Sequence, residues 1–294
     1  MTPRTGTPQT GTPHLTLVLG AAGTTGRRVA ERLAARGVPT RLGSRAGTPR
    51  FDWADDTTWP AVLTDVRAVY LVYYPDLVAP AALERVRAFA HLAVSAGARR
   101  LVLLSGRGEE QARAAERVVL ESGAEWTVVR AAFFAQNFSE KGFEELVRAG
   151  TVALPAPPVG EPFVDADDIA DVVVAALADE GHAGQLYEVT GPRLLTFEQA
   201  VAEIAEATGR PLDYRRVAAA DFVAGLVAQG VPGEEASVFA EIFGTVLDGR
   251  NAHLADGVRR ALGRPPTDFA DYAATTATSG IWDPHPAEVG GPRA

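Results

Sequence analysis

The most constraining feature of this chain is a strand-like run that leads directly into three spaced glycines. Residues 15–20 read LTLVLG, and the heptapeptide GAAGTTG spans 20–26. The stretch 26–36 then carries small or apolar residues at spacings of three and four, which is typical of an amphipathic helix. A strand, a glycine-rich turn and a helix in this order predict that a phosphate-bearing ligand lies close to the backbone.

Each glycine of the turn has a physical role in this interpretation. Gly20 permits a tight turn, Gly23 lets the backbone approach a pyrophosphate, and Gly26 lets the helix pack closely on the strand. The pyrophosphate would lie on the unpaired N–H groups at the positive end of the helix. The alternative is a glycine-rich turn without a ligand, because a chain with 29 glycines produces such matches by chance.

The first half of the chain alternates short apolar runs with helical patterns. The strand-like runs are 15–20, 38–43, 68–74, 100–105 and 125–130, and the helices lie near 26–36, 58–65, 78–96 and 108–122. Strands that are apolar almost throughout and separated by helices predict a parallel sheet covered on both faces. The predicted fold class is therefore α/β, with a doubly wound parallel-sheet Rossmann domain.

The alternation loosens after residue 131. The segment 133–150 reads as one helix ended by Gly150, and 151–163 reads as a loop because its prolines exclude a central strand. The later signals are a capping Asp165 before a helix at 166–178, a strand at 185–190, a capping box of Thr196 and Gln199, and helices from 218 to 280. These elements predict a smaller, mainly helical C-terminal substrate lobe, into which strands of the sheet are interleaved.

The end of the second predicted strand indicates which dinucleotide binds. Sites for NAD usually place an acidic residue there, on the ribose 2′-hydroxyl, but this chain has no acid between Glu31 and Asp52. Ser44 and Arg45 stand where the acid would be, and a guanidinium suits a 2′-phosphate. The sequence therefore predicts NADP(H) as the cofactor, with an ordinary surface role for Arg45 as the alternative.

Composition narrows the classes of partner and of chemistry. The net charge of −9 argues against a nucleic-acid partner, and the absence of cysteine excludes disulfides, thiolate nucleophiles and cysteine-ligated metals. The five histidines show no metal-ligand spacing, so no metal site is predicted. No apolar run approaches the length of a membrane span, and residues 1–14 have no apolar stretch of the kind that a signal peptide needs, which predicts a cytoplasmic protein with no membrane partner. The expected partner is a small-molecule substrate, and the expected state is a monomer or homodimer.

The expected domain organisation follows from these patterns. It comprises a disordered leader at 1–14, an NADP-binding Rossmann domain at 15–155, the substrate lobe at 156–282 and a tail at 283–294.

Four segments together resemble the NmrA-like family of atypical short-chain dehydrogenases. They are GAAGTTG, FDW at 51–53, FFAQNFSE at 133–140 and FVDADDIADV at 163–172. Within that family the chain is most similar to NAD(P)H-binding oxidoreductases of ergot-alkaloid pathways, the festuclavine dehydrogenase-like reductases. One departure lies at 129–131, where relatives commonly read Leu-Arg-Pro and this chain reads Val-Arg-Ala.

The resemblance implies roles for individual residues. Gly20, Gly23, Thr24, Thr25 and Gly26 would hold the pyrophosphate, Ser44 and Arg45 the 2′-phosphate, and Asp52 and Trp53 would flank the adenine. Tyr73, Tyr74 and Pro75 would line the ribose and nicotinamide, Ser105 would face the nicotinamide pocket, and Phe133, Phe134 and Asn137 would border the substrate. The phenylalanines Phe133, Phe134, Phe138, Phe163, Phe239 and Phe243 also suggest a broad apolar pocket, although most aromatic residues are core.

The usual catalytic pair of short-chain dehydrogenases, Tyr-x-x-x-Lys, is missing. The chain has a single lysine, Lys141, and no tyrosine between Tyr74 and Tyr187. Either the chemistry needs little acid catalysis, as with an iminium or an activated quinone, or the protein binds NADP(H) without turnover. In the first case Tyr73, Tyr74 or a water on Ser105 could supply a proton.

Two kinds of residue in this region also have a structural interpretation. Ser105 could instead cap the following helix, and Glu109 and Glu110 could stabilise the dipole of that helix.

The predicted function is an NADPH-dependent reductase of a small, planar, hydrophobic substrate such as an imine or iminium, an enone or a quinone. The alternative is a non-catalytic, redox-sensing regulator that binds NADP(H) and contacts a protein partner.

Overall fold

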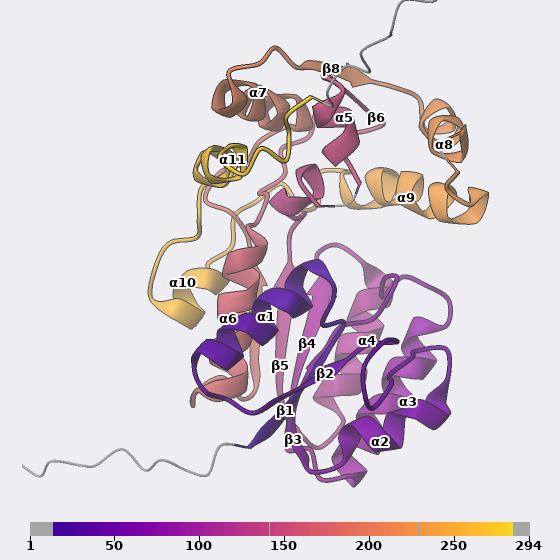
Figure 1. Cartoon of the computed structure of the whole chain (residues 1–294), viewed down its shortest axis with the longest axis vertical. Helices are drawn as coiled ribbons and strands as arrows, with labels where there is room; N and C mark the ends of the chain where they lie inside the picture. The colour runs from indigo at the N-terminus through magenta and orange to yellow at the C-terminus, as the bar shows by residue number, and fades with distance from the viewer. Residues whose placement is uncertain (1–13, 141, 229, 285–294) are drawn as a thin grey trace, which may run out of the picture.

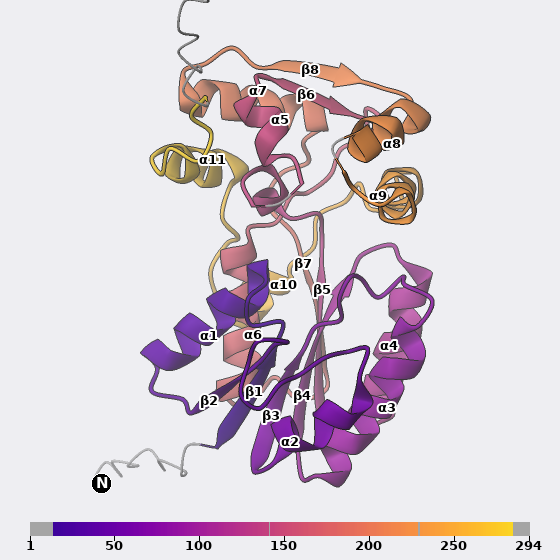
Figure 2. The same cartoon turned by 45° about the vertical axis from the view of Figure 1, so that its right-hand side comes forward.

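The computed structural model describes residues 14–140, 142–228 and 230–284. Lys141, residues 1–13 of the expected leader and residues 285–294 of the expected tail lie outside this part of the chain. Figures 1 and 2 show two lobes, one above the other, with the glycine-rich turn in the lower lobe at the side that faces the upper one.

The lower lobe is built on a parallel six-stranded sheet with the order β2-β1-β3-β4-β5-β7. The strands are β1 (Leu15–Leu19), β2 (Thr40–Gly43), β3 (Val66–Leu71), β4 (Arg100–Gly106), β5 (Glu125–Ala131) and β7 (Gln185–Val189). Each predicted strand-like run is a strand here, although β3 ends at Leu71 instead of continuing to residue 74. The predicted fold class, a doubly wound α/β domain, is confirmed.

Helices cover both faces of this sheet (Figures 1 and 2). One face carries α1 (Thr24–Ala35), α6 (Ala166–Ala178) and α10 (Gly257–Leu262), and the other carries α2 (Trp59–Leu63), α3 (Ala82–Ser95) and α4 (Glu110–Leu120). Alternate side chains of β1 point to opposite faces of the sheet. Val18 packs in the core with α1 and α6, and Leu17 and Leu19 pack in the core with α2, α3 and α4. Two separate cores result, both closed to solvent.

The order of the strands reverses between β1 and β3. The chain goes from β1 outward to β2, then crosses back to β3 on the other side of β1. In open α/β sheets a ligand binds outside the carboxyl ends of the strands at such a switch point. The turn at 20–26 follows β1 and therefore lies at this point.

The upper lobe lies beyond the carboxyl ends of the strands (Figures 1 and 2). Its elements are the 3-10 helix η2 (Ala135–Phe138), α5 (Glu144–Arg148), β6 (Thr151–Leu154), α7 (Phe197–Thr208), β8 (Asp213–Arg216), α8 (Ala219–Ala228), α9 (Gly233–Val246) and α11 (Phe269–Ala277). The chain enters this lobe after β5, returns to the sheet for α6 and β7, and returns again for α10. The lobes are thus interleaved along the chain.

The core of the upper lobe is largely aromatic. Phe138, Phe163 and Phe197 are almost completely buried, with the ring centroids of Phe163 and Phe197 5.0 Å apart. Phe243 is also buried against this cluster, whereas Phe239 is exposed. The suggestion that these phenylalanines line a pocket is therefore wrong for the buried ones, which fill the interior of the lobe.

Two local predictions for this lobe are wrong. The single helix expected at 133–150 is divided into η2 and α5, and Gly142 between them has a φ of +101°, outside the helical region. The expected loop at 151–163 begins with β6, which pairs in parallel with β8. The prolines of that segment start at residue 155, so they do not interrupt the strand.

The predicted caps are confirmed. The side chain of Asp165 accepts a hydrogen bond from the N–H of Asp167 at the start of α6. Thr196 and Gln199 form a reciprocal capping box at the start of α7, with distances of 3.2 and 2.8 Å.

In the described part of the chain no helix is both long and apolar enough to cross a membrane. Nor do the same residues contain a group of three or more acidic or histidine side chains placed to hold a metal ion.

Candidate functional site at the carboxyl edge of the sheet

The glycine-rich turn forms a cradle that has no room for side chains. Gly20 has a φ of +61°, and its carbonyl accepts a hydrogen bond of 2.8 Å from the N–H of Gly23. A Cβ on Gly26 would lie 2.1 Å from the Gly20 oxygen, and one on Gly23 would lie 3.1 Å from it. The predicted role of Gly20 in a tight turn is therefore confirmed, and Gly26 allows the first turn of α1 to pack on the loop.

The N-terminus of α1 is available to an anion. The helix begins at Thr24, two residues before the predicted start, with Gly23 as its N-cap and no side-chain cap. A helix N-terminus without a cap leaves N–H donors and a partial positive charge for a ligand. The side chain of Thr25 is buried, and its Oγ1 accepts a 2.8 Å hydrogen bond from the hydroxyl of buried Tyr70.

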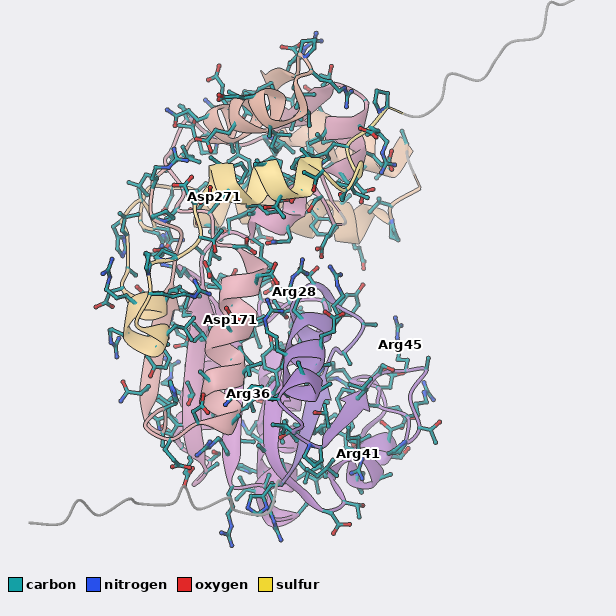
Figure 3. All side chains as sticks on the ribbon, turned by 60° about the vertical axis from the view of Figure 1, so that its left-hand side comes forward. Arg28, Arg36, Arg41, Arg45, Asp171 and Asp271 are labelled. Carbon is teal, nitrogen blue, oxygen red and sulfur yellow. The ribbon has the colours of Figure 1, made fainter. Side chains whose placement is uncertain are left out.

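The three arginines near the end of β2 differ in their contacts. Arg41 donates to the carbonyl oxygens of Val62 and Thr64 at 2.8 and 2.6 Å, and Arg50 pairs with Asp52 at 2.7 Å. Arg45 is exposed and extends away from the loop after β2 (Figure 3). Since Gly43 pairs with Leu19, the loop that carries Ser44 and Arg45 starts beside the glycine-rich turn.

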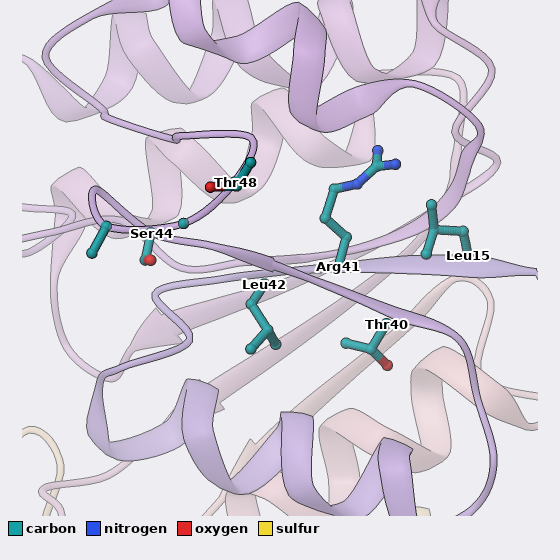
Figure 4. A pocket seen from close by; sticks show the side chains of 8 residues that line it. Leu15, Thr40, Arg41, Leu42, Ser44 and Thr48 are labelled. Atoms are coloured by element: carbon teal, nitrogen blue, oxygen red, sulfur yellow. The ribbon is translucent and has the colours of Figure 1, made fainter.

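A shallow hollow of about 640 Å³ lies along the edge strand β2 (Figure 4). Its lining comes from β1, β2 and the loop after β2, and includes Ser44 and Thr48. No residue of the upper lobe borders it, so it adjoins the predicted 2′-phosphate region but is not a cleft between the lobes.

The predicted adenine and ribose residues lie in the loops after β2 and β3. Trp53 packs in a cluster with Phe51 and Tyr73, and its indole N–H donates to the Val72 carbonyl at 3.1 Å. The N–H of Ala54, followed by the charge of Arg50, holds the pKa of Asp52 below its ordinary value. These contacts fix the two loops next to the switch point; the roles predicted for Asp52 and Trp53 stay predictions.

The predicted proton donors differ in exposure. Tyr73 is nearly buried, its ring centroid lies 4.9 Å from that of Trp53, and burial raises its pKa. Tyr74 is 67% exposed and precedes Pro75 in the loop after β3, beyond the end of the strand. Ser105, at the end of β4, is buried, and its hydroxyl donates a 2.6 Å hydrogen bond to Glu116. Ser105 therefore contacts α4 through the Glu116 side chain and does not cap the helix, which was the alternative interpretation.

Ser105 belongs to a chain of charged side chains that the sequence analysis missed. Arg130 of β5 donates to both carboxylate oxygens of Glu116, at 2.9 and 2.5 Å, and to Glu188 of β7 at 2.9 Å. Arg107, which follows β4, is 3.8 Å from Glu188 and also contacts His253, 2.8 Å away. The signal in the sequence was a charged residue inside an apolar strand, at 130 and at 188.

A second buried acid lies where the lobes meet. Glu161 is 1% exposed, and its Oε1 accepts the N–H of Phe133 at 3.1 Å. Its Oε2 and the Nε of Arg107 are buried and have no hydrogen-bond partner among the described residues. Burial raises the pKa of Glu161 to about 7, although the Phe133 N–H and the charge of Arg107 act to lower it.

Of the predicted substrate residues, Phe133 contacts this acid through its backbone N–H. The ring of Phe133 packs against Phe197 and Phe163, with centroids 5.2 and 6.0 Å apart, and so contacts the core of the upper lobe. Phe134 forms a backbone bridge to Val164 and packs on the other core, and Asn137 is half-buried in η2. Their roles toward a substrate stay predictions.

The segments that carry the family resemblance join α1 to the rest of the site. Glu140, the last residue of FFAQNFSE, forms ion pairs of 2.5 Å with Arg27 and Arg28, directly after Gly26. Arg32 pairs with Asp167 and Asp171 of α6 at 2.5 and 2.6 Å. In Figure 3, Arg28 lies at the end of α1 nearest the upper lobe and Asp171 lies on the adjacent α6. The N-terminal end of α1 is thus tied to the upper lobe by charge.

An acidic pair lies beyond the carboxyl ends of β3 and β4. The carboxyl group of Glu109, the N-cap residue of α4, lies over the backbone of Gly106 at the end of β4, within 2.5 Å of the position that a Cβ on that glycine would take. Asp76, in the loop after β3, is the acid with the larger effect on its pKa. Burial, Asp76 and then Glu116 raise the pKa of Glu109 to about 8.

Comparison with known proteins agrees with this geometry. Residues 111–262 match the NmrA-like family. The chain is 30% identical to an NAD(P)H azoreductase of Xenophilus azovorans over 262 residues, 85% of this chain and 86% of that protein, and 29% identical to an agroclavine dehydrogenase of Claviceps fusiformis over 280 residues, 88% and 96% of the two. The fold is similar to that of an Escherichia coli NADPH-dependent quinone oxidoreductase solved with NADPH, with a TM-score of 0.74, 20% identity and coverage of 89% and 99%. The chain belongs to the NmrA-like family.

Proposed function

We propose that this protein is an NADPH-dependent reductase that transfers hydride to a small, planar, hydrophobic acceptor such as an imine or iminium, an enone or a quinone. The observation that carries the proposal is the cradle of Gly20, Gly23 and Gly26 before the uncapped start of α1, at the switch point of a parallel sheet. The azoreductase and agroclavine dehydrogenase relatives support an oxidoreductase role.

The residues around the cradle fit a dinucleotide. The backbone N–H groups at the start of α1 would hold the pyrophosphate. A side chain at 26 would displace the turn that forms the cradle, because its Cβ would lie 2.1 Å from the Gly20 oxygen. Ser44 and Arg45, next to the glycine-rich turn, would hold the 2′-phosphate that distinguishes NADPH from NADH. When bound, the dihydronicotinamide supplies a hydride.

The rest of the site positions the acceptor and excludes water. The buried charged chain from Ser105 to Glu188 fixes the ends of β4, β5 and β7, against which the nicotinamide end would lie. Phe133, Phe134 and Asn137 connect this edge to the upper lobe and would border the acceptor. Holding the acceptor next to the hydride donor is the main contribution that such a site makes to the rate.

The test is NADPH oxidation, followed by absorbance, with a panel of imines, quinones and enones. We expect turnover with at least one class, and a Gly23→Val variant that folds but does not bind NADPH. Tight NADPH binding without oxidation by any acceptor would favour the alternative, a redox-sensing regulator that contacts a protein partner. A Gly23→Val variant with wild-type affinity would contradict the proposed cofactor site itself.

A further inference from the structure

We propose that Glu109 is the proton donor of this reductase, in place of the missing tyrosine–lysine pair. The inference rests on the proposed function, because it concerns how a neutral acceptor is protonated at the same site. It assigns a catalytic role to a residue whose position in a first helical turn otherwise suggests only an interaction with the helix dipole.

The position of Glu109 is the first argument. Its carboxyl group lies above the backbone of Gly106, the last residue of β4, and a side chain at 106 would occupy the same space. The neighbouring strand on one side is β3, whose following loop carries Asp76 and lies beside the switch point. Glu109 is only partly buried, so an acceptor can reach it, whereas Glu161 and Glu116 are enclosed.

The other candidate donors are already engaged or poorly placed. The hydroxyl of Ser105 donates its proton to Glu116 and is buried. Tyr73 packs against Trp53, and burial raises its pKa further above the neutral range. Tyr74 is 67% exposed, on a loop beyond the strand. A donor must lie within hydrogen-bond reach of the acceptor and titrate near the working pH.

The charges that face Glu109 keep it protonated. Burial, then Asp76 from the loop after β3 and Glu116 from its own helix, raise the pKa of Glu109 to about 8, and burial raises the pKa of Asp76 as well. The nearby cations are occupied elsewhere: Arg130 by Glu116 and Glu188, Arg107 by His253 and the Asn251 carbonyl, and Arg250 by Asp248. A carboxyl group in this setting is a neutral acid at pH 7 and can give up its proton when negative charge develops beside it.

The proton step balances with the hydride transfer. Hydride adds to the electrophilic carbon of a neutral imine or enone, and the π electrons move to the nitrogen or oxygen at the other end of the acceptor. That atom forms a bond to the proton as the O–H bond of Glu109 breaks. The Glu109 carboxylate then takes a proton from water, so that one NADPH and one solvent proton are consumed for each acceptor reduced.

The first test is a direct titration of the protein without cofactor. Carbon-13 NMR of the glutamate carboxyl groups, with Glu109 assigned by the resonance lost in Glu109→Gln, should give a midpoint near 8. Asp76→Asn should move that midpoint down by about one pH unit or more, because it removes the first of the two negative neighbours. A midpoint at the ordinary value for glutamate would overturn the inference.

The second test compares a neutral acceptor with a cationic one. A cationic iminium accepts hydride without needing a proton, whereas a neutral enone needs one. Glu109→Gln should lower kcat for the enone about 100-fold or more and leave kcat for the iminium within a few-fold of wild type. Glu110→Gln, in the same helical turn but exposed, is the matched control and should change neither.

The outcomes separate this inference from the function it rests on. If the wild-type protein reduces both acceptors and Glu109→Gln lowers both rates equally or neither, Glu109 is not the proton donor while the reductase proposal stands. If the wild-type protein reduces no acceptor although it binds NADPH, the reductase proposal itself fails. The NMR titration does not depend on turnover. A Glu109 midpoint at the ordinary value for glutamate would therefore reject the inference about Glu109 whether or not the protein is a reductase.

Discussion

Replacing Glu161 by glutamine tests whether a carboxyl group at the junction of the lobes is protonated in the folded protein. The side chain is 1% exposed, and only its Oε1 has a hydrogen-bond donor, the Phe133 N–H, among the described residues. Burial raises the pKa of this group to about 7 from an ordinary value of 4.5. Glutamine has the shape of the protonated acid and does not ionise.

The sign of the effect follows from that difference. Because the pKa of Glu161 is higher in the folded than in the unfolded state, its contribution to stability is fully present below about pH 4.5 and is lost as the pH rises through about 7. The full difference corresponds to about 3 kcal/mol of unfolding free energy. About 2 kcal/mol of this should be lost between pH 5 and pH 8, since the unfolded state is already largely ionised at pH 5.

Urea unfolding of the wild type and of Glu161→Gln at pH 5 and pH 8 measures this loss. We expect the variant to gain about 2 kcal/mol relative to wild type over that interval. The control is Glu84→Gln, whose side chain is 78% exposed, and its difference from wild type should not change with pH. If the difference in unfolding free energy between Glu161→Gln and wild type is the same at pH 5 and pH 8, the reasoning is refuted. If the stability of the variant relative to wild type falls from pH 5 to pH 8, Arg107 keeps Glu161 ionised.

The sheet and the glycine-rich turn could be predicted because their signals are local. An apolar run of six residues and three glycines at fixed spacing need no knowledge of distant partners, and β1, the turn and α1 lie within two residues of their predicted limits. The missing acid before Asp52 is equally local. Such features depend on backbone geometry that the sequence specifies by itself.

The segments that could not be predicted depend on partners far along the chain. β6 pairs with β8, about sixty residues later, and the sequence of β8, DYRR, is polar and mostly exposed, so that it lacks the alternation of a half-buried strand. The helix expected at 133–150 is divided at Gly142, whose φ is +101°. The pairing of β6 with β8 in particular depends on contacts made only in the folded lobe.

The candidate site shows the same division. Arg130 and Glu188 were visible as charges inside apolar strands, yet only the parallel pairing of β5 with β7 places one beside the other. Glu109 was noted for its place in a helical turn, but its position over Gly106 and near Asp76 needs the order of β3 and β4 in the sheet. Chemistry that arises between elements becomes visible only once the elements are assembled.

Three further substitutions test the cofactor cradle and its link to the upper lobe. Arg45→Ala should weaken NADPH binding about 10- to 100-fold and leave NADH binding unchanged, because a hydrogen bond to a charged group contributes about 1.5–3 kcal/mol. The loss should be smaller at high salt, since this contact would be exposed. Equal losses in fluorescence titrations with the two cofactors would show that Arg45 has a structural role. Gly26→Ala places a Cβ 2.1 Å from the Gly20 oxygen. Calorimetry should therefore detect no NADPH binding, even at a temperature where circular dichroism shows a folded protein. Unchanged binding would contradict the proposed cofactor cradle. Glu140→Gln removes the ion pairs with Arg27 and Arg28, and although burial acts in the opposite direction, these pairs hold the pKa of Glu140 below its ordinary value. The stability that Glu140 contributes is therefore present above about pH 4.5 and lost as the pH falls below it, the reverse of Glu161. We expect the variant to be about 1.5–3 kcal/mol less stable than wild type in urea at pH 7, with the difference shrinking towards pH 4. A loss that is the same at both pH values would show that packing, and not charge, joins the start of α1 to the upper lobe.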